Sequence, residues 1–309
     1  MTRLAWAPEA GENAAVAEHL YLDAPSLVYR AFFAWPKSIT DPHGRSVNAV
    51  RGFMEMTTRL LTDRRPAEIV AVFDSNYRPE FRVAAYPAYK AARPDDPPEL
   101  PRQFDVLATV LDAAGIRRAE SPGLEADDAI ATLVEEIPPG ERYLVVTGDR
   151  DLLCLVRDPD VGVLFTIKGV TELHEFDEAA VAEKYGIPPD LYPAFATLRG
   201  DPSDGLPGVA GIGPVRAVKL LTEYGSIDGI MANLDSLPPK QAAAFKASSD
   251  YLEAMKTVVT LPRDVPIKAT NSHAPDEERV RELVEEHGLG SSGTRLIRAL
   301  DRAQGGGQP

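Results

Sequence analysis

The sequence predicts an α/β protein in which a mainly parallel sheet is followed by a helical region. Up to about residue 187, short apolar stretches that suit buried strands alternate with patterns that suit helices, an order typical of parallel sheets. After that point the strand signals fade, and proline, glycine and short helical stretches dominate. Three of the apolar stretches end in aspartate, which bears on function because ligands of such sheets bind beyond the carboxyl ends of the strands.

The predicted strands are short, apolar and bounded by polar residues. EHLYLD ends at Asp23, EIVAVFD ends at Asp74, and RYLVVTGD ends at Asp149, while IRRAES is a fourth candidate. Because parallel strands present their carboxyl ends at one edge of a sheet, we expect these aspartates to meet there. In chain order, the predicted strands cover residues 18–23, 68–74, 116–121 and 142–149.

Helices are predicted between the strands from apolar residues three and four positions apart. A glycine at position 115 marks the end of the second helix. The third helix begins within GLEADDAIATL and has three carboxylates in its first turn. A helix N-terminus favours acids, but three acids within four positions also repel one another. The predicted helices and this last stretch cover residues 47–61, 103–115 and 123–133.

Composition narrows the class of protein. The chain of 309 residues is 44% hydrophobic and 26% charged, which is ordinary for a globular protein. We expect a cytoplasmic protein with no membrane partner, because no apolar run approaches the roughly 20 residues of a membrane span and no signal peptide is evident. The single Cys154 fits a reducing compartment. A net charge of −14 argues against a protein that binds nucleic acid. The argument fails if the acids gather at bound cations, which reverse the local charge.

Nine acidic residues fall in short, separate motifs. If they share a cleft, they cannot all stay ionised near neutral pH without cations. Carboxylate oxygens without histidine or cysteine favour Mg²⁺ or Mn²⁺, and nine of them exceed the needs of one ion, so we expect two divalent cations. The candidate metal ligands are Asp23, Asp74, Glu125, Asp127, Asp128, Asp149, Asp151, Asp201 and Asp204.

Five ordered motifs resemble the flap endonuclease and 5′-nuclease family. They are YLDAPSLVYRAFF, VFD with FRVAAYPAYKAAR, GLEADDAIATL, VVTGDRDLLCLV and LRGDPSDGLPGVAGIGPVRAVKLLTEYGSI. Over residues 18–260 the chain is similar to the 5′-nuclease domain of bacterial DNA polymerase I in free-standing form. The resemblance implies a PIN-like nuclease core, a helix–three-turn–helix module, two divalent metal ions, and cleavage of DNA that has 5′ ends, flaps or nicks.

The resemblance also divides the acids between the two metal ions, and Asp23 would lie beside the first ion. The ligands implied for the first ion are Asp74, Glu125, Asp127 and Asp128. Those implied for the second are Asp149, Asp151, Asp201 and Asp204.

Segment 77–93, YRPEFRVAAYPAYKAAR, is a basic stretch. The resemblance implies that Lys90 and Arg93 approach the scissile phosphate, which makes them the candidate catalytic residues that stabilise charge. Arg82 and Tyr89 are predicted to contact DNA, with Tyr89 stacking on a terminal base. The alternative is a solvated helix face with tyrosines in the core.

The stretch GVAGIGPVRAVKLL, residues 208–221, resembles the hairpin of the helix–three-turn–helix module. Its glycines would allow backbone amides to approach a duplex phosphate, and two basic residues add charge. The resemblance also implies a K⁺ ion between this hairpin and DNA. The alternative is a loop that only caps a helix. The DNA-binding candidates here are Gly208, Gly211, Gly213, Arg216 and Lys219.

We predict a monomeric, structure-specific 5′-nuclease that acts as a 5′-3′ exonuclease and flap endonuclease. A PIN-domain ribonuclease and a non-catalytic binder of branched DNA are the alternatives. Gly205 and Ala24 stand where the family often has asparagine and glycine, and neither change removes a ligand. The predicted regions are an N-terminal extension (1–17), a PIN-like nuclease core (18–187), a helical region with the DNA-binding module (188–290) and a C-terminal tail (291–309) whose end should be disordered.

Overall fold

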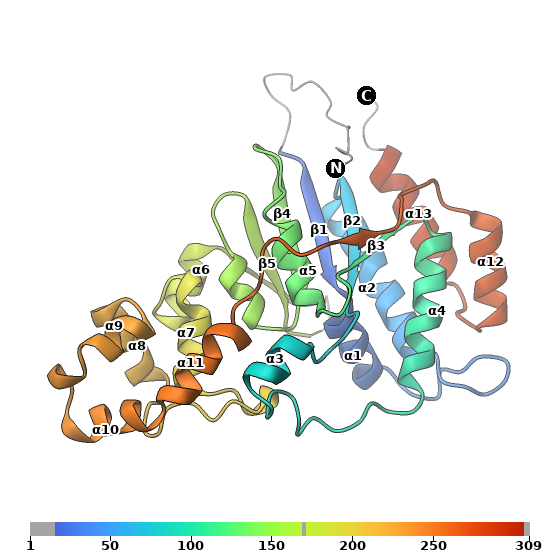
Figure 1. The fold of residues 1–309 in the computed structure, drawn as a ribbon. Helices are drawn as coiled ribbons and strands as arrows, with labels where there is room; N and C mark the ends of the chain where they lie inside the picture. Colours follow the sequence, from blue (N-terminus) through green and yellow to red (C-terminus); the bar gives the residue numbers. More distant parts are fainter. Residues whose placement is uncertain (1–15, 169–170, 306–309) are drawn as a thin grey trace.

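The computed structural model describes residues 16–168 and 171–305, so most of the predicted N-terminal extension lies outside the described residues. A seven-stranded sheet in the order β6-β5-β4-β1-β2-β3-β7 forms its centre (Figure 1). Strands β5, β4, β1, β2 and β3 are parallel, whereas β6 and β7 are antiparallel to their neighbours. The strands are β1 (Glu18–Asp23), β2 (Glu68–Phe73), β3 (Arg117–Glu120), β4 (Arg142–Thr147), β5 (Val161–Thr166), β6 (Leu173–Phe176) and β7 (Lys268–Ala269).

The four predicted strands are therefore present, while β5, β6 and β7 were not predicted. The helices before the helical region are α1 (Ala24–Ala34), α2 (Asn48–Arg64), α3 (Glu80–Ala85), α4 (Leu100–Ala113), α5 (Ala126–Leu133) and α6 (Glu178–Tyr185). Those that follow are α7 (Tyr192–Arg199), α8 (Pro214–Tyr224), α9 (Ile227–Ala232), α10 (Pro239–Ala247), α11 (Ser249–Val258), α12 (Glu277–Glu286) and α13 (Ser292–Gly305).

Two hydrophobic cores lie on the two faces of the sheet. Successive side chains of a strand point to opposite faces, so Leu20 and Leu22 join one core while Tyr21 joins the other. The first core contains residues of α1, α2, α4, α12 and α13, and the second contains residues of α5, α7 and α8. Helices thus cover both faces of the sheet (Figure 1), as the predicted α/β class requires.

The helical region from α7 to α11 lies to one side of the sheet (Figure 1). Helices α7 and α8 pack against each other, and the loop at 208–213 is the last part of the connection between them, which covers residues 200–213. One hydrogen bond ties the loop to α7, from the Val209 amide to the Leu198 carbonyl, and one lies within the loop, from the Ile212 amide to the Val209 carbonyl. This arrangement agrees with a helical region, whereas DNA binding by this region and its boundary at 187/188 stay predictions.

The last part of the chain differs from the expectation. Residues 292–305, predicted as part of a tail, form α13, which packs on α2 through a face that includes Leu296 and Leu300. Helix α12 lies against α4, and β7 pairs with β3. The segment from β7 onward therefore packs against the sheet and the helices α2 and α4, where its apolar residues have their partners.

Among the described residues, no helix combines the length and the apolar composition needed to cross a membrane.

Candidate active site

The strand ends bring acidic side chains to one edge of the sheet. Asp23 ends β1, Asp74 directly follows β2 and Asp149 follows β4, and β1 pairs in parallel with both of the other strands. Asp23 accepts a hydrogen bond from the Thr147 hydroxyl at 2.5 Å. Asp74 accepts one from the Ala126 amide at 2.7 Å. The sheet topology therefore places these aspartates at the same carboxyl edge, as we expected.

Helix α5 brings a further group of acids to this edge. Glu125 is its N-cap and forms a capping box with Asp128, whose Oδ2 accepts from the Glu125 amide at 3.1 Å. The favourable interaction of acids with a helix N-terminus is thus realised by two of the three carboxylates. The third, Asp127, lines a cavity instead.

One cavity collects most of the predicted acids. It is lined by six of them together with Tyr89 and Lys90. Two come from the loop after β4, and two come from the loop after α7, which lies next to segment 77–93 because the Lys90 amide donates to the Asp204 carbonyl at 2.9 Å. The acids that line the cavity are Glu125, Asp127, Asp149, Asp151, Asp201 and Asp204.

Burial and mutual repulsion make these carboxyl groups hard to ionise. Burial, followed by the charges of neighbouring carboxylates, raises the pKa of Asp127 well above its usual range. Burial also raises the pKa of Asp23 to about 7, of Asp74 to about 6, and of Asp149 and Asp151 above the ordinary value, in spite of hydrogen bonds to several of them. Such a site strongly favours bound cations.

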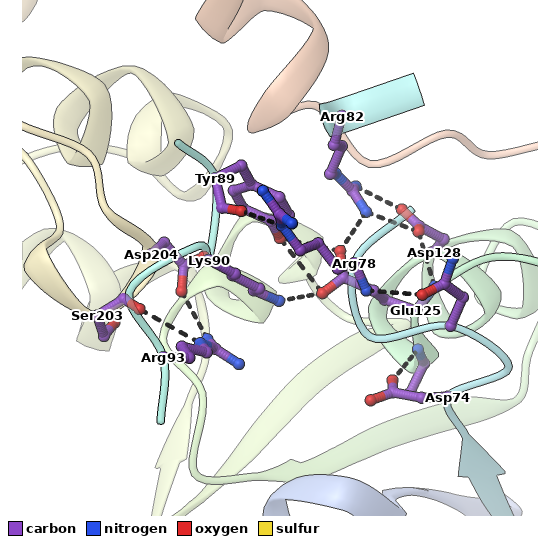
Figure 2. Close-up of polar contacts among 12 residues, drawn as sticks. Asp74, Arg78, Arg82, Tyr89, Lys90, Arg93, Glu125, Asp128, Ser203 and Asp204 are labelled. Carbon is purple, nitrogen blue, oxygen red and sulfur yellow. Dashed lines mark hydrogen bonds and ion pairs between the residues drawn. The ribbon is translucent and has the colours of Figure 1, made fainter. Parts of the chain in front are cut away.

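The chain's own basic side chains already contact part of this site. Figure 2 shows Lys90, Arg82 and Tyr89 converging on Glu125. The Lys90 ammonium forms an ion pair with Glu125 Oε1, and the Tyr89 hydroxyl donates to Glu125 Oε2 at 2.9 Å. Nearby, Arg93 Nη2 donates to Asp204 Oδ1 at 2.6 Å.

The donor set fits a divalent cation, but its arrangement is not that of a ready-made metal centre. Within residues 16–168 and 171–305, no three acidic, histidine or cysteine side chains are arranged to hold an ion. Buried carboxylates of raised pKa, all with hard oxygen donors, nevertheless suit Mg²⁺ or Mn²⁺. The ion pairs of Glu125 with Lys90 and of Asp204 with Arg93 account for part of the difference.

Three predicted site residues have surroundings that differ from the expectation. Arg82 is 2% exposed and Tyr89 is 5% exposed, and both line the cavity, so the DNA contact of Arg82 and the base stacking of Tyr89 stay predictions that this burial does not favour. Tyr89 also packs in a small buried cluster with Leu206, Met255 and Val258, which agrees with the alternative of a tyrosine in the core. Asp128 is fully buried, and both of its carboxylate oxygens accept from Arg82. It therefore faces a guanidinium and not the cavity.

The hairpin candidates belong to the helical region, and none of them lines the cavity. Gly208 and Gly211 have φ of +72° and +79°, which only glycine adopts readily. Arg216 is exposed and donates to the Gly211 carbonyl at 2.6 Å, and Lys219 is also exposed. A phosphate contact by these residues stays a prediction.

Sequence reasoning missed Arg30. Its guanidinium lies over Gly148, where a Cβ would come within 2.5 Å of Arg30 Nη2, and Nη1 donates to the Ile167 carbonyl at 3.3 Å. Arg30 follows Asp23 by seven residues, which is about two turns of α1. This spacing was a signal that both side chains share one face of the helix, next to the acidic edge.

Comparison with known proteins identifies the family of the chain and agrees with its fold. The family described as 5′-3′ exonuclease, N-terminal resolvase-like domain, matches residues 18–186, and the one described as 5′-3′ exonuclease, C-terminal SAM fold, matches residues 187–281. A 5′-3′ exonuclease of Streptomyces coelicolor is 43% identical over 91% of this chain and 99% of its own length.

DNA polymerase I of Mycobacterium tuberculosis is 44% identical over 89% of this chain, which spans 30% of the length of that relative. The crystal structure of the bacteriophage T5 flap endonuclease, in a complex with DNA and metal ions, has a TM-score of 0.62 at 19% identity and covers 93% of this chain and 99% of its own. This likeness confirms the predicted fold. With both domains matched in order by the family, the chain belongs to the 5′-3′ exonuclease family.

Proposed function

We propose that the chain is a structure-specific 5′-nuclease that hydrolyses DNA phosphodiesters with two divalent cations, Mg²⁺ or Mn²⁺. The observation that carries this proposal is the cavity in which six carboxylates and Lys90 meet at the carboxyl edge of the sheet. Membership of a 5′-3′ exonuclease family supports hydrolysis. The flap endonuclease of the same fold, in its complex with DNA and metal ions, supports branched DNA as the substrate.

The acids at the cavity would hold the cations, with Asp23 and Asp74 at the strand ends beside those that line it. Bound ions supply an activated water and stabilise negative charge on the attacking and leaving oxygens. Asp128 would act through its neighbours, because Arg82 occupies both of its oxygens.

Lys90 and Arg93 would change partners when metal and DNA bind. In this structure, they neutralise Glu125 and Asp204. A cation on these carboxylates removes the reason for both ion pairs, so the two basic side chains become free to pair with the oxygens of the scissile phosphate. Charge-assisted hydrogen bonds to those oxygens are the stabilisation that phosphoryl transfer requires.

The hairpin at 208–213 would contact the duplex part of the substrate. Gly211, Gly213 and Lys219 are exposed in the helical region, and contacts of backbone amides with phosphates position a duplex without reading its sequence. A K⁺ ion between the hairpin and DNA is part of the proposal. We further propose a monomer that acts on DNA with 5′ ends, flaps or nicks.

Incubation of the protein with a labelled 5′-flap DNA and Mn²⁺ tests the proposal. We expect a short 5′-phosphorylated product, full inhibition by EDTA, and no product with Asp149→Asn. The matched control is Asp112→Asn, which removes an acid that pairs with Arg118 on the surface and should cleave normally. Binding without cleavage would favour the non-catalytic binder, and preference for a matched RNA flap would favour the ribonuclease.

A further inference from the structure

The side chain of Arg82 joins three separate segments of the chain. From α3 it reaches the acids at the start of α5, with Nη1 2.6 Å from Glu125 Oε2 and 2.8 Å from Asp128 Oδ2, and Nη2 2.6 Å from Asp128 Oδ1. On its other side, Nε donates to the Val258 carbonyl at 2.9 Å, and Nη2 lies 3.5 Å from the Thr260 carbonyl. Figure 2 shows Arg82 directed from α3 toward both carboxylates.

These contacts satisfy the whole guanidinium group in a buried place. Each nitrogen of Arg82 has a partner, and the residue is 2% exposed. The Val258 carbonyl lies at the C-terminus of α11, which favours a cation, whereas the N-terminus of α5 favours the two carboxylates with which Arg82 pairs. Lysine has only three donors on a point charge and cannot reproduce this planar fork.

Packing around Arg82 supports the same connection. Tyr89 and Leu206 form a small buried cluster with Met255 and Val258 of α11, and α3 and α11 are in direct contact. Arg82 is therefore part of the attachment between the helical region and the segment that carries Lys90.

We propose that Arg82 is a positioning residue that fixes Glu125 and Asp128 and ties them to the end of α11. Metal binding in the nuclease core then depends on the attachment of the helical region, and Asp128 contributes through Arg82 and not as a direct ligand. This inference rests on the proposed function in one respect, because it takes Glu125 as a ligand of the divalent cation. Partners of metal ligands commonly change metal affinity by about 10–100-fold when they are replaced.

Arg82→Lys tests this role by two measurements that need no substrate. Mn²⁺ binding, followed by titration calorimetry without DNA, should weaken by about 10–100-fold. Amide hydrogen exchange should become faster both at 125–130 and at 255–260. The matched control is Arg118→Lys, which removes a bidentate pair with Asp112 and should leave both measurements unchanged. Unchanged Mn²⁺ affinity in a folded Arg82→Lys protein would overturn the proposal.

Asp128→Asn keeps the test decisive if Arg82→Lys does not fold. This change retains the side-chain volume and one acceptor oxygen, but it removes the negative charge and one of the two oxygens to which Arg82 donates. We expect faster exchange at 255–260, although Asp128 itself bonds to neither Val258 nor Thr260. A residue that acts only as a metal ligand would leave exchange there unchanged, and that result would refute the connection. A protein that passes both tests yet cleaves no DNA would contradict the proposed function alone.

Discussion

Single replacements of the three hairpin glycines should separate the folding role of this loop from its role in binding DNA. Gly213 has φ of −93°, and an added Cβ would have nothing within 4 Å. Gly211 has equally open surroundings but φ of +79°, and Gly208 combines φ of +72° with a Cβ position 2.7 Å from the backbone of Arg199 and Gly200. The three sites therefore differ in strain while sharing one loop.

The expected changes in the free energy of unfolding follow from this geometry. Gly213→Val should cost about 0.5–1 kcal/mol, because valine is a poorer N-cap for α8 than glycine. Gly211→Ala should cost about 1 kcal/mol for its positive φ. Gly208→Ala adds a backbone clash to the same strain and should cost on the order of 3 kcal/mol or more. Thermal or urea unfolding without DNA measures all three.

Gly213→Val, which should change stability least, should nevertheless weaken the binding of duplex DNA. A valine at 213 would keep a phosphate away from the loop amides, and the loss of one such hydrogen bond, about 0.5–1.5 kcal/mol, weakens duplex binding by roughly 2–13-fold. Lys219→Ala is the matched control, because it removes a charge and should make the logarithmic salt slope shallower by about 0.9. Gly213→Val should lower affinity with little change in slope.

Fluorescence anisotropy in the Asp149→Asn background measures binding without cleavage. A nicked duplex with a 5′ flap should bind more weakly to the Gly213→Val protein, whereas a short single strand should bind as before. Equal affinity for the duplex in a stably folded Gly213→Val protein would refute the reasoning and leave the loop as a helix cap.

Three further predictions concern single side chains. Asp149→Asn should abolish cleavage without lowering the melting temperature, because burial raises the pKa of this acid and its side-chain oxygen can still accept from the Asp151 amide; normal turnover in a flap assay would contradict the metal assignment. Lys90→Met should slow single-turnover cleavage by about 10²–10³-fold with little loss of duplex affinity, and a loss of affinity alone would make Lys90 a phosphate anchor. Burial alone would raise the pKa of Asp41, but hydrogen bonds, chiefly from Arg45, lower it to about 2. Since this lies below the unfolded value of about 3.9, ionised Asp41 stabilises the fold above about pH 4, and the contribution is lost as the pH falls toward 2. Asp41→Asn should therefore lower the melting temperature at pH 7 but hardly at pH 2, and an equal loss at both would exclude this origin.

Much of the fold could be predicted from local patterns. Residues 18–23 and 68–74 are apolar runs that end in an acid, and residues 47–61 repeat apolar residues at helical spacing, so each carries its own signal of a strand or a helix. Strand β7 carries no such signal, because its two exposed residues, Lys268 and Ala269, form a strand only through pairing with β3.

Helix α13 shows the same limit in a different form. Leu296 and Leu300 have helical spacing, but a polar, glycine-bounded stretch near the chain end also suits a tail. The helix gains its stability from packing on α2, since helical stability in proteins comes mainly from the burial of one apolar face. Contact with a helix more than two hundred residues earlier cannot be inferred from that stretch alone.

The sequence by itself determined four of the strands and the helices between them, the family, and the edge of the sheet at which the acids meet, because hydrophobic period, strand ends and motif spacing can be read from the sequence directly. Only the tertiary structure decided which of these acids face the cavity. Arg82 looked like one more DNA-binding cation, yet folding pairs it with Asp128 and with a carbonyl of Val258. A buried guanidinium must find partners for all of its donors, and the positions of those partners are set by how α3, α5 and α11 pack together.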